Sequence, residues 1–354
     1  MNTQKFTSSE TFNFENGSVI TGLEIAYQTF GTLNEKQDNV IWVCHALTGN
    51  ADVFDWWQGL FGEDDLFNPK DYFIVCPNVL GSHYGTTCPL STNPETNKPY
   101  YLHFPQFTVR DMTAVQRLLA DHLNIQTISV LIGGSLGGQQ AMEWAIVEPS
   151  RIKKLILIAT NAQHSPWGIA FNESQRLALA SDSSFFTESP EAGKTGLKAA
   201  RSIALLSYRN YETYANSQQE DGNDKVDDFR ASSYQNYQGD KLVKRFNSFS
   251  YWYLLKAMDS HNVGRNRESI TAALKTIQAK TLVIGIRSDL LFPPSEQKFL
   301  ADKIHGASYL EIDSFYGHDG FLIETGILTY EIIKFLKHAT VENHQEEFQN
   351  SLKS

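Results

Sequence analysis

The stretch Ile128-Ser129-Val130-Leu131-Ile132-Gly133-Gly134-Ser135-Leu136-Gly137 decides the fold of this chain. Its first five residues form an apolar run that predicts a buried strand, and residues 138–147 are typical of a helix. Small residues two before and two after Ser135 allow a sharp turn, because a Cβ at either place would clash with the backbone. The sequence therefore predicts a strand, a tight turn and a helix, with a serine hydroxyl exposed at the turn. A glycine-rich turn with an incidental serine is the alternative.

The composition of the chain limits the classes of protein to consider. The 354 residues are 41% hydrophobic and 20% charged, which is ordinary for a globular protein, and the net charge of −10 argues against nucleic acid as a partner. No apolar run approaches the ~20 residues of a membrane span, and residues 1–5 lack the apolar core of a signal peptide. The chain has three cysteines, Cys44, Cys76 and Cys88, too few for a disulfide framework. These features predict a cytoplasmic protein with no membrane partner.

Several short apolar runs predict buried strands, and they share a near-continuous apolar character. They are residues 40–44, 72–76, 130–132, 155–158 and 281–285. Strands of this kind are covered by helices on both faces, as in a parallel sheet. The first 30 residues differ, because their apolar residues alternate with polar ones as in antiparallel strands. The sequence therefore predicts the α/β class, with a mixed, mostly parallel sheet that starts with antiparallel strands.

The strand pattern stops between residues 165 and 276, where helical spacing takes over and a polar run, Ser217 to Asp228, predicts an exposed loop. We therefore expect residues 1–164 and 277–340 to form one α/β core. Residues 165–276 are expected to form a helical lid inserted between two strands, and residues 341–354 a polar tail.

A serine hydroxyl is a weak nucleophile and needs a histidine base oriented by a carboxylate. In folds of this type the acid and the histidine follow the serine in the chain, each just past the end of a later strand. Asp289 follows the strand at Thr281 to Ile286, and His318 follows the strand around residues 309–312. Asp289 could instead cap a turn and His318 could be a surface histidine. Chain order, strand topology and the sharp turn together favour a Ser135, Asp289, His318 triad.

A tetrahedral oxyanion needs two backbone donors. The N–H of Leu136, directly after the serine, is one candidate. The other is the N–H of Leu47, in the loop His45-Ala46-Leu47-Thr48-Gly49 after the first predicted parallel strand. His45 is expected to be structural, with its hydrogen bonds inside the loop. The histidines show no paired metal-ligand spacing, so no metal site is expected.

Several separate motifs, spread over residues 10 to 338, resemble those of the homoserine O-acetyltransferases of the α/β-hydrolase superfamily. The motifs are His45-Ala46-Leu47-Thr48-Gly49, Asn78-Val79-Leu80-Gly81, Phe104-Pro105, Thr108-Val109-Arg110-Asp111-Met112, Gly133-Gly134-Ser135, Gly137-Gly138, Gly196-Leu197, Ala200-Arg201, Tyr237-Gln238-Gly239, Ala257-Met258-Asp259, Tyr316-Gly317-His318-Asp319 and Phe321-Leu322. The resemblance implies an α/β-hydrolase fold with an inserted helical lid.

The resemblance also assigns the acceptor site. Arg201 is similar to the arginine that holds the substrate carboxylate, and a guanidinium can pair with a carboxylate through two hydrogen bonds. Asp319 is similar to the carboxylate that receives the substrate ammonium. From the residues alone, Arg201 could be a surface arginine and Asp319 a helix-capping carboxylate. Arg209 is a second candidate from the same helical region.

The resemblance implies that an acetyl group moves from acetyl-CoA to L-homoserine through an acyl-serine, in a ping-pong reaction that serves methionine biosynthesis. It implies a homodimer with acetyl-CoA as co-substrate and no permanently bound cofactor. Cys88, in Gly85-Thr86-Thr87-Cys88-Pro89, stands where the family usually has glycine, which leaves the acyl donor open. A homoserine succinyltransferase, a serine acyltransferase, a carboxylesterase and a catalytically inactive binding module remain as alternatives.

Overall fold

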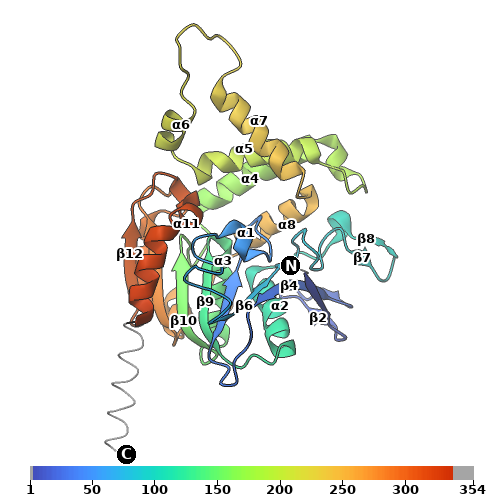
Figure 1. The fold of residues 1–354 in the computed structure, drawn as a ribbon. Helices are drawn as coiled ribbons and strands as arrows, with labels where there is room; N and C mark the ends of the chain where they lie inside the picture. Colours follow the sequence, from blue (N-terminus) through green and yellow to red (C-terminus); the bar gives the residue numbers. More distant parts are fainter. Residues whose placement is uncertain (1–2, 338–354) are drawn as a thin grey trace, which may run out of the picture.

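The computed structural model describes residues 3–337 and is built on an eight-stranded sheet of order β1-β4-β6-β5-β9-β10-β11-β12 (Figure 1). The strands are β1 (Gln4–Thr7), β4 (Glu24–Phe30), β5 (Val40–Cys44), β6 (Phe73–Pro77), β9 (Ile128–Gly134), β10 (Ile152–Ile158), β11 (Lys280–Ile286) and β12 (Ser308–Ile312). The pairs β1–β4 and β4–β6 are antiparallel, and every pair from β6 to β12 along the sheet is parallel. The prediction of a mostly parallel mixed sheet with an antiparallel start is confirmed.

Two short hairpins lie outside this sheet. One pairs β2 (Phe12–Asn13) with β3 (Val19–Ile20), and the other pairs β7 (Thr92–Asn93) with β8 (Lys98–Pro99). The alternating residues near position 12 therefore belong to a separate hairpin, while the alternating residues near position 25 belong to β4 of the large sheet.

The sheet is covered on both faces, as its apolar strands predict. Along β5, Trp42 and Cys44 enter one hydrophobic cluster, whereas Ile41 and Val43 enter another on the opposite face. The first cluster includes side chains from α2 (Val109–His122), α3 (Leu136–Val147) and α10 (Pro294–Lys303). The second includes side chains from α1 (Val53–Trp56), α11 (Gly320–Ile323) and the helical residues 325–337. The segments outside the lid also contain two single-turn helices, η1 (Tyr101–His103) and η3 (Gly317–Asp319).

Helices fill the chain between β10 and β11 and lie above the sheet (Figure 1). They are α4 (Pro166–Ser181), η2 (Ser183–Phe186), α5 (Lys194–Tyr208), α6 (Tyr211–Ser217), α7 (Arg230–Val243), α8 (Ser248–Asp259) and α9 (Ile270–Lys275). Residues 218–229 have no helix or strand, in the segment where the sequence predicts a loop. The division of the chain into a core and a lid as separate units stays a prediction, and the tail predicted for residues 341–354 lies outside the described residues.

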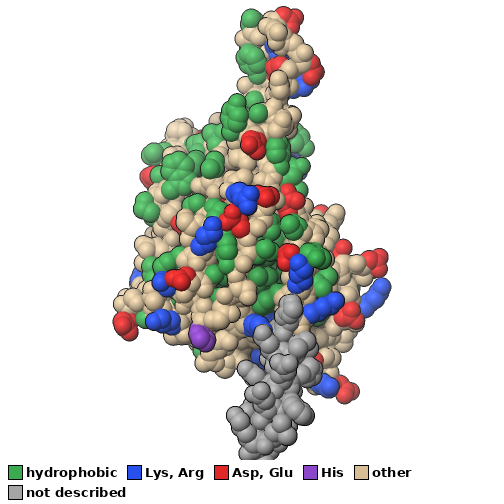
Figure 2. Space-filling model, turned by 90° about the vertical axis from the view of Figure 1, so that its left-hand side faces the viewer, with side chains coloured by type: hydrophobic (Ala, Val, Ile, Leu, Met, Phe, Trp, Pro, Cys, Tyr) green, Lys and Arg blue, Asp and Glu red, His purple; other side chains and the backbone are tan. Residues whose placement is uncertain are grey.

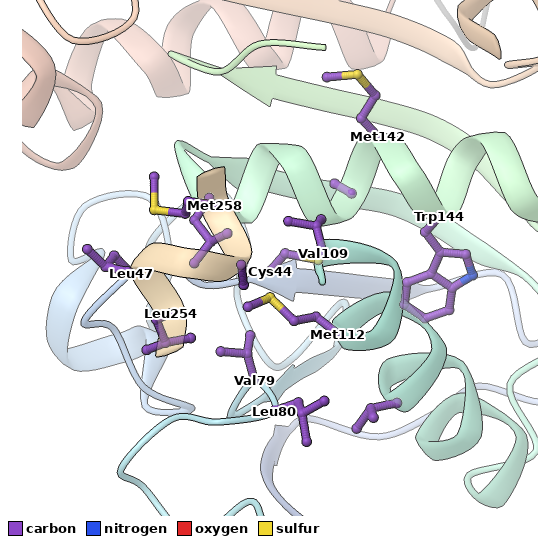
Figure 3. Packing of buried hydrophobic residues seen from close by; sticks show 14 of the residues in the cluster. Cys44, Leu47, Val79, Leu80, Val109, Met112, Met142, Trp144, Leu254 and Met258 are labelled. Carbon is purple, nitrogen blue, oxygen red and sulfur yellow. The ribbon is translucent and has the colours of Figure 1, made fainter. Parts of the chain in front are cut away.

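One lid helix, α8, is part of the core packing. Nine of its twelve residues are buried, and Leu254 and Met258 share a hydrophobic cluster with Cys44 and Leu47 of the core (Figure 3). In contrast, α7 has only two buried residues among its fourteen and projects away from the sheet (Figure 1). Across residues 3–337, no helix combines the length and apolarity that a membrane crossing requires.

Candidate active site

Ser135 lies between the end of β9 and the start of α3, in a strained turn. Its backbone angles are φ 55° and ψ −126°, a conformation that costs an L residue about 1–3 kcal/mol. The turn holds because its neighbours are glycines. A Cβ at Gly133 would lie 2.3 Å from the backbone of Gly137, and a Cβ at Gly137 would lie 2.0 Å from the carbonyl oxygen of Cys44. The two glycines thus allow β9, α3 and the end of β5 to approach closely around the serine.

Asp289 and His318 form a buried pair at the ends of β11 and β12. Asp289 Oδ2 lies 2.7 Å from His318 Nδ1. Asp289 Oδ1 accepts hydrogen bonds from the backbone N–H groups of Leu291 (2.8 Å) and Phe292 (2.9 Å), which fix the carboxylate. Because Nδ1–H donates to the carboxylate, Nε2 is the ring nitrogen left to accept a proton.

The surroundings of His318 hold its ring in place and set its basicity. The ring stacks on Phe292 with centroids 5.0 Å apart, and the ring of Tyr208 lies 5.9 Å away. Burial acts most strongly on the pKa of His318 and lowers it. The charge and hydrogen bond of Asp289, with the charge of Asp319, outweigh burial and raise that pKa above its usual 6.5. The imidazole is therefore a stronger base than an unpaired histidine.

Ser135 and His318 line one cavity of about 190 Å³. Within the described part of the chain, no direct hydrogen bond joins the two side chains. In ligand-free enzymes the bond between nucleophile and base is often long, and it shortens when substrate binds. The rest of the wall combines core and lid: Ala46, Leu47, Thr48, Gly49, Trp56, Arg201, Tyr208, Arg245, Asp319, Phe321 and Leu322. A larger, open hollow of about 490 Å³ lies beside His164 and His261, but none of the predicted catalytic residues lines it.

The loop of residues 45–49 brings Leu47 to this cavity. Between residues 3 and 337, no hydrogen bond occupies the backbone N–H of Leu47 or of Leu136, so both are available to an oxyanion. His45 holds the loop: its Nε2 accepts from the N–H of Val79 at 3.0 Å, and its Nδ1 lies 2.8 Å from the Ala46 carbonyl oxygen. Burial lowers the pKa of His45 to about 4, which keeps the ring neutral. These contacts agree with the expected structural role of His45.

The two residues predicted to bind an amino acid also reach the cavity. Arg201, on α5, has a buried Nε that finds no hydrogen-bond partner among residues 3–337, and its guanidinium lies 5.4 Å from the ring centre of Tyr208. Asp319 Oδ2 lies 3.0 Å from Nε of Arg209, which is not among the cavity-lining residues. Burial is the main influence on the pKa of Asp319 and raises it, although Arg209 and Arg201 act in the opposite direction. Arg209 is thus an ion-pair partner of Asp319, whereas Arg201 lines the cavity itself.

The sequence did not single out every residue of the cavity wall. Arg245, which follows α7, bonds to Thr48, and Trp56 and Tyr208 complete the wall. No motif or spacing marks these three positions, because the packing of the core brings Trp56 to the site and the packing of the lid on the core brings Tyr208 and Arg245 there. In the part of the chain that the structure describes, no cluster of three or more His, Cys, Asp or Glu side chains is arranged to hold a metal ion.

The architecture and the strained serine turn define the class of protein. Residues 39–325 match the family described as alpha/beta hydrolase fold. The fold also resembles that of esterase E22, with a TM-score of 0.86 at 23% sequence identity and 95% and 99% of the two chains covered. The chain is therefore an α/β hydrolase by fold.

Closer relatives narrow the class. The chain is 48% identical over 335 residues to a homoserine O-acetyltransferase of Cyclobacterium marinum, with 95% of each chain covered. It is 44% identical to a homoserine O-acetyltransferase of Chlorobaculum tepidum, with 96% of each covered. The solved homoserine O-acetyltransferase of Bacillus anthracis superposes with a TM-score of 0.86 at 25% identity, over 95% of this chain and 97% of that one. The chain belongs to the homoserine O-acetyltransferase family, as its motifs predicted.

Proposed function

We propose that this protein transfers an acetyl group from acetyl-CoA to the hydroxyl of L-homoserine, giving O-acetyl-L-homoserine for methionine biosynthesis. The observation that carries the proposal is the buried Asp289–His318 pair, whose histidine lines the same cavity as a serine held in a strained strand-to-helix turn. The names of the relatives, at up to 48% identity over nearly the whole chain, support the choice of acetyl group and acceptor.

In the first half-reaction, Ser135 Oγ attacks the thioester carbonyl carbon while His318 Nε2 takes the serine proton. Negative charge develops on the carbonyl oxygen, where the N–H groups of Leu47 and Leu136 stabilise it. The carbon–sulfur bond then breaks, and the departing thiolate takes the proton from His318. An acetyl ester on Ser135 and free coenzyme A remain.

In the second half-reaction, homoserine enters the cavity with its carboxylate at Arg201 and its ammonium at Asp319. His318 takes the proton from the homoserine hydroxyl, whose oxygen attacks the acetyl-serine carbonyl. The ester bond to Ser135 breaks, the serine oxygen recovers the proton from His318, and O-acetylhomoserine leaves. Arg201 lies in the wall of the cavity, and its Nε has no hydrogen-bond partner among the described residues, which supports this assignment.

Transfer to homoserine has to compete with hydrolysis by water. The cavity is small, about 190 Å³, and both core and lid form its wall. A bound acceptor therefore displaces water from the acetyl-serine, and its fixed orientation gives it a high effective concentration at the ester. On this account the triad forms and breaks the acetyl ester, and the acceptor site determines that homoserine, and not water, receives the acetyl group.

Steady-state kinetics with pairs of acyl donor and acceptor test the proposal. We expect parallel double-reciprocal lines for acetyl-CoA and L-homoserine, with much lower kcat/KM values for succinyl-CoA and for L-serine. A preference for succinyl-CoA or L-serine would assign the alternative transferases. Rapid turnover of p-nitrophenyl acetate, with no acceleration by homoserine and no acetylhomoserine formed, would identify a carboxylesterase and contradict the proposal.

We further propose a cytoplasmic homodimer without a permanently bound cofactor. Hydrophobic side chains exposed on the lid support a protein contact there (Figure 2). They include Leu177 on α4, Phe186 on η2, Leu206 on α5 and Tyr237 on α7. Sedimentation velocity at micromolar concentration should give the mass of two chains, and a monomer at that concentration would contradict the dimer.

A further inference from the structure

Arg245 connects the lid to the loop that carries Leu47. Its Nη1 donates to the carbonyl oxygen of Thr48 at 2.7 Å and to the hydroxyl of Tyr84 at 2.6 Å. Its Nη2 donates to Thr48 Oγ1 at 3.3 Å. The side chain lines the catalytic cavity, but these bonds direct its charge toward the Thr48 backbone. Arg245 thus differs from Arg201, whose Nε has no hydrogen-bond partner within the described part of the chain.

The hydrogen bonds of the loop link Arg245 to the predicted oxyanion donor. The peptide group between Thr48 and Gly49 accepts from Arg245 through its C=O and donates through its N–H to the Ala46 carbonyl oxygen at 2.9 Å. The Ala46 carbonyl belongs to the peptide group whose N–H is that of Leu47. Because a peptide group is planar and trans, fixing its C=O also fixes the direction of its N–H. Each bond in such a chain also polarises the next.

Arg245 has a rigid support. Phe246 packs against Tyr84, with ring centroids 5.8 Å apart. Asn247 Nδ2 lies 2.9 Å from His83 Nδ1, and Asn247 Oδ1 accepts from the N–H of Ser250 and so caps α8. Since α8 is mostly buried, the guanidinium extends from a fixed point of the lid and not from a mobile surface loop.

We propose that Arg245 is a positioning residue that orients the Leu47 N–H for the oxyanion, through the Thr48–Gly49 and Ala46–Leu47 peptide groups. The inference rests on the proposed acyl transfer at Ser135 and adds a lid residue to its machinery. It makes the oxyanion hole depend on the docking of the lid. The His45 bond to the Ala46 carbonyl restrains the same peptide group from the core side, so loss of Arg245 displaces the donor without removing it.

The test compares Arg245→Met, Arg245→Lys and Tyr84→Phe. Removing one oxyanion donor costs about 10²–10³-fold in kcat, so displacing one should slow acetylation of Ser135 by about 10–100-fold in Arg245→Met. The KM for acetyl-CoA should change much less. Arg245→Lys keeps a donor for the Thr48 carbonyl and should recover most of the rate. Tyr84→Phe removes only the other acceptor of Nη1 and is the matched control, expected to acetylate at close to the wild-type rate.

Inhibition by a trifluoromethyl ketone separates a positioning role of Arg245 from a purely structural one, because a structural role would leave the inhibition constant unchanged. The ketone adds to Ser135 as a hemiketal oxyanion, so its inhibition constant should rise in Arg245→Met by the same factor as acetylation slows. An unchanged inhibition constant, or acetylation within two-fold of wild type, would overturn the positioning role. If Arg245→Met does not fold, as judged by circular dichroism, Arg245→Gln, whose shorter and uncharged side chain also loses the bond to the Thr48 carbonyl, is compared with Tyr84→Phe by the same two measurements. Failure of the wild-type enzyme to form an acetyl-enzyme would instead contradict the proposed function.

Discussion

The two sides of the catalytic cavity have different origins. The core side carries Ser135, Asp289 and His318, whose places follow from strand ends and one sharp turn. The lid side carries Arg201, Tyr208 and Arg245, which reach the cavity from inserted helices and the segment after α7. Solved esterases share the fold at a TM-score of 0.86, so the fold alone does not separate a hydrolase from a transferase. The comparison supports the proposal that the triad of the core carries the acyl group, while residues of the lid complete the site around it.

The largest expected effect comes from the core side. Ser135→Ala removes the nucleophile, and kcat/KM for acetyl-CoA should fall by about 10⁴–10⁶-fold, as in other serine triads. Coenzyme A release, followed with a thiol reagent, measures the loss. Retention of more than a few per cent of the activity would show that another group accepts the acetyl.

Asp289→Asn should lower kcat by about 10²–10⁴-fold. An amide nitrogen in place of Oδ2 donates to His318 Nδ1, which moves the ring proton to Nε2 and removes the base. Because Oδ1 can still accept from Leu291 and Phe292, the local structure should survive, with an unchanged circular dichroism spectrum. A decrease below ten-fold would mean that the carboxylate does not orient the base.

A lid-side change should act on the acceptor. Arg201→Lys keeps the charge but loses the paired geometry, so the KM for homoserine should rise by about 10–150-fold, the range for charge-assisted hydrogen bonds of 1.5–3 kcal/mol. The effect should be larger on the homoserine half-reaction than on acetylation by acetyl-CoA. Stopped-flow measurement of each half separately checks this. Equal losses of rate in the two half-reactions would contradict the assignment of Arg201 to the acceptor.

The smallest expected effect is a shift in pH dependence. His318 must be neutral to act as a base, so kcat/KM for acetyl-CoA should fall as the pH drops through an apparent pKa above 6.5. Asp319→Asn removes a negative charge that raises the pKa of His318, and the acid limb should therefore move to lower pH. The pH profile of acetylation, measured without homoserine, tests the sign. A shift to higher pH would contradict the assigned charges.

The site residues of the core side could be predicted from the sequence because local patterns mark their positions. An apolar strand, small residues around a serine and a following helix predict the turn, and the order of strand ends points to Asp289 and His318. The lid side could not be predicted in the same way. The bond from Arg245 to Thr48 joins residues 197 positions apart, and the ion pair of Arg209 with Asp319 exists only once the lid helices are docked. Arg201 and Asp319 emerged from family resemblance and not from any periodicity.

The most direct measurement is the intact mass of the enzyme after mixing with acetyl-CoA in the absence of an acceptor. The account predicts one added acetyl group, located by peptide mapping to Ser135, which L-homoserine discharges as O-acetylhomoserine faster than water does. An enzyme that turns over without an adduct, or an adduct that persists in Ser135→Ala, would contradict it.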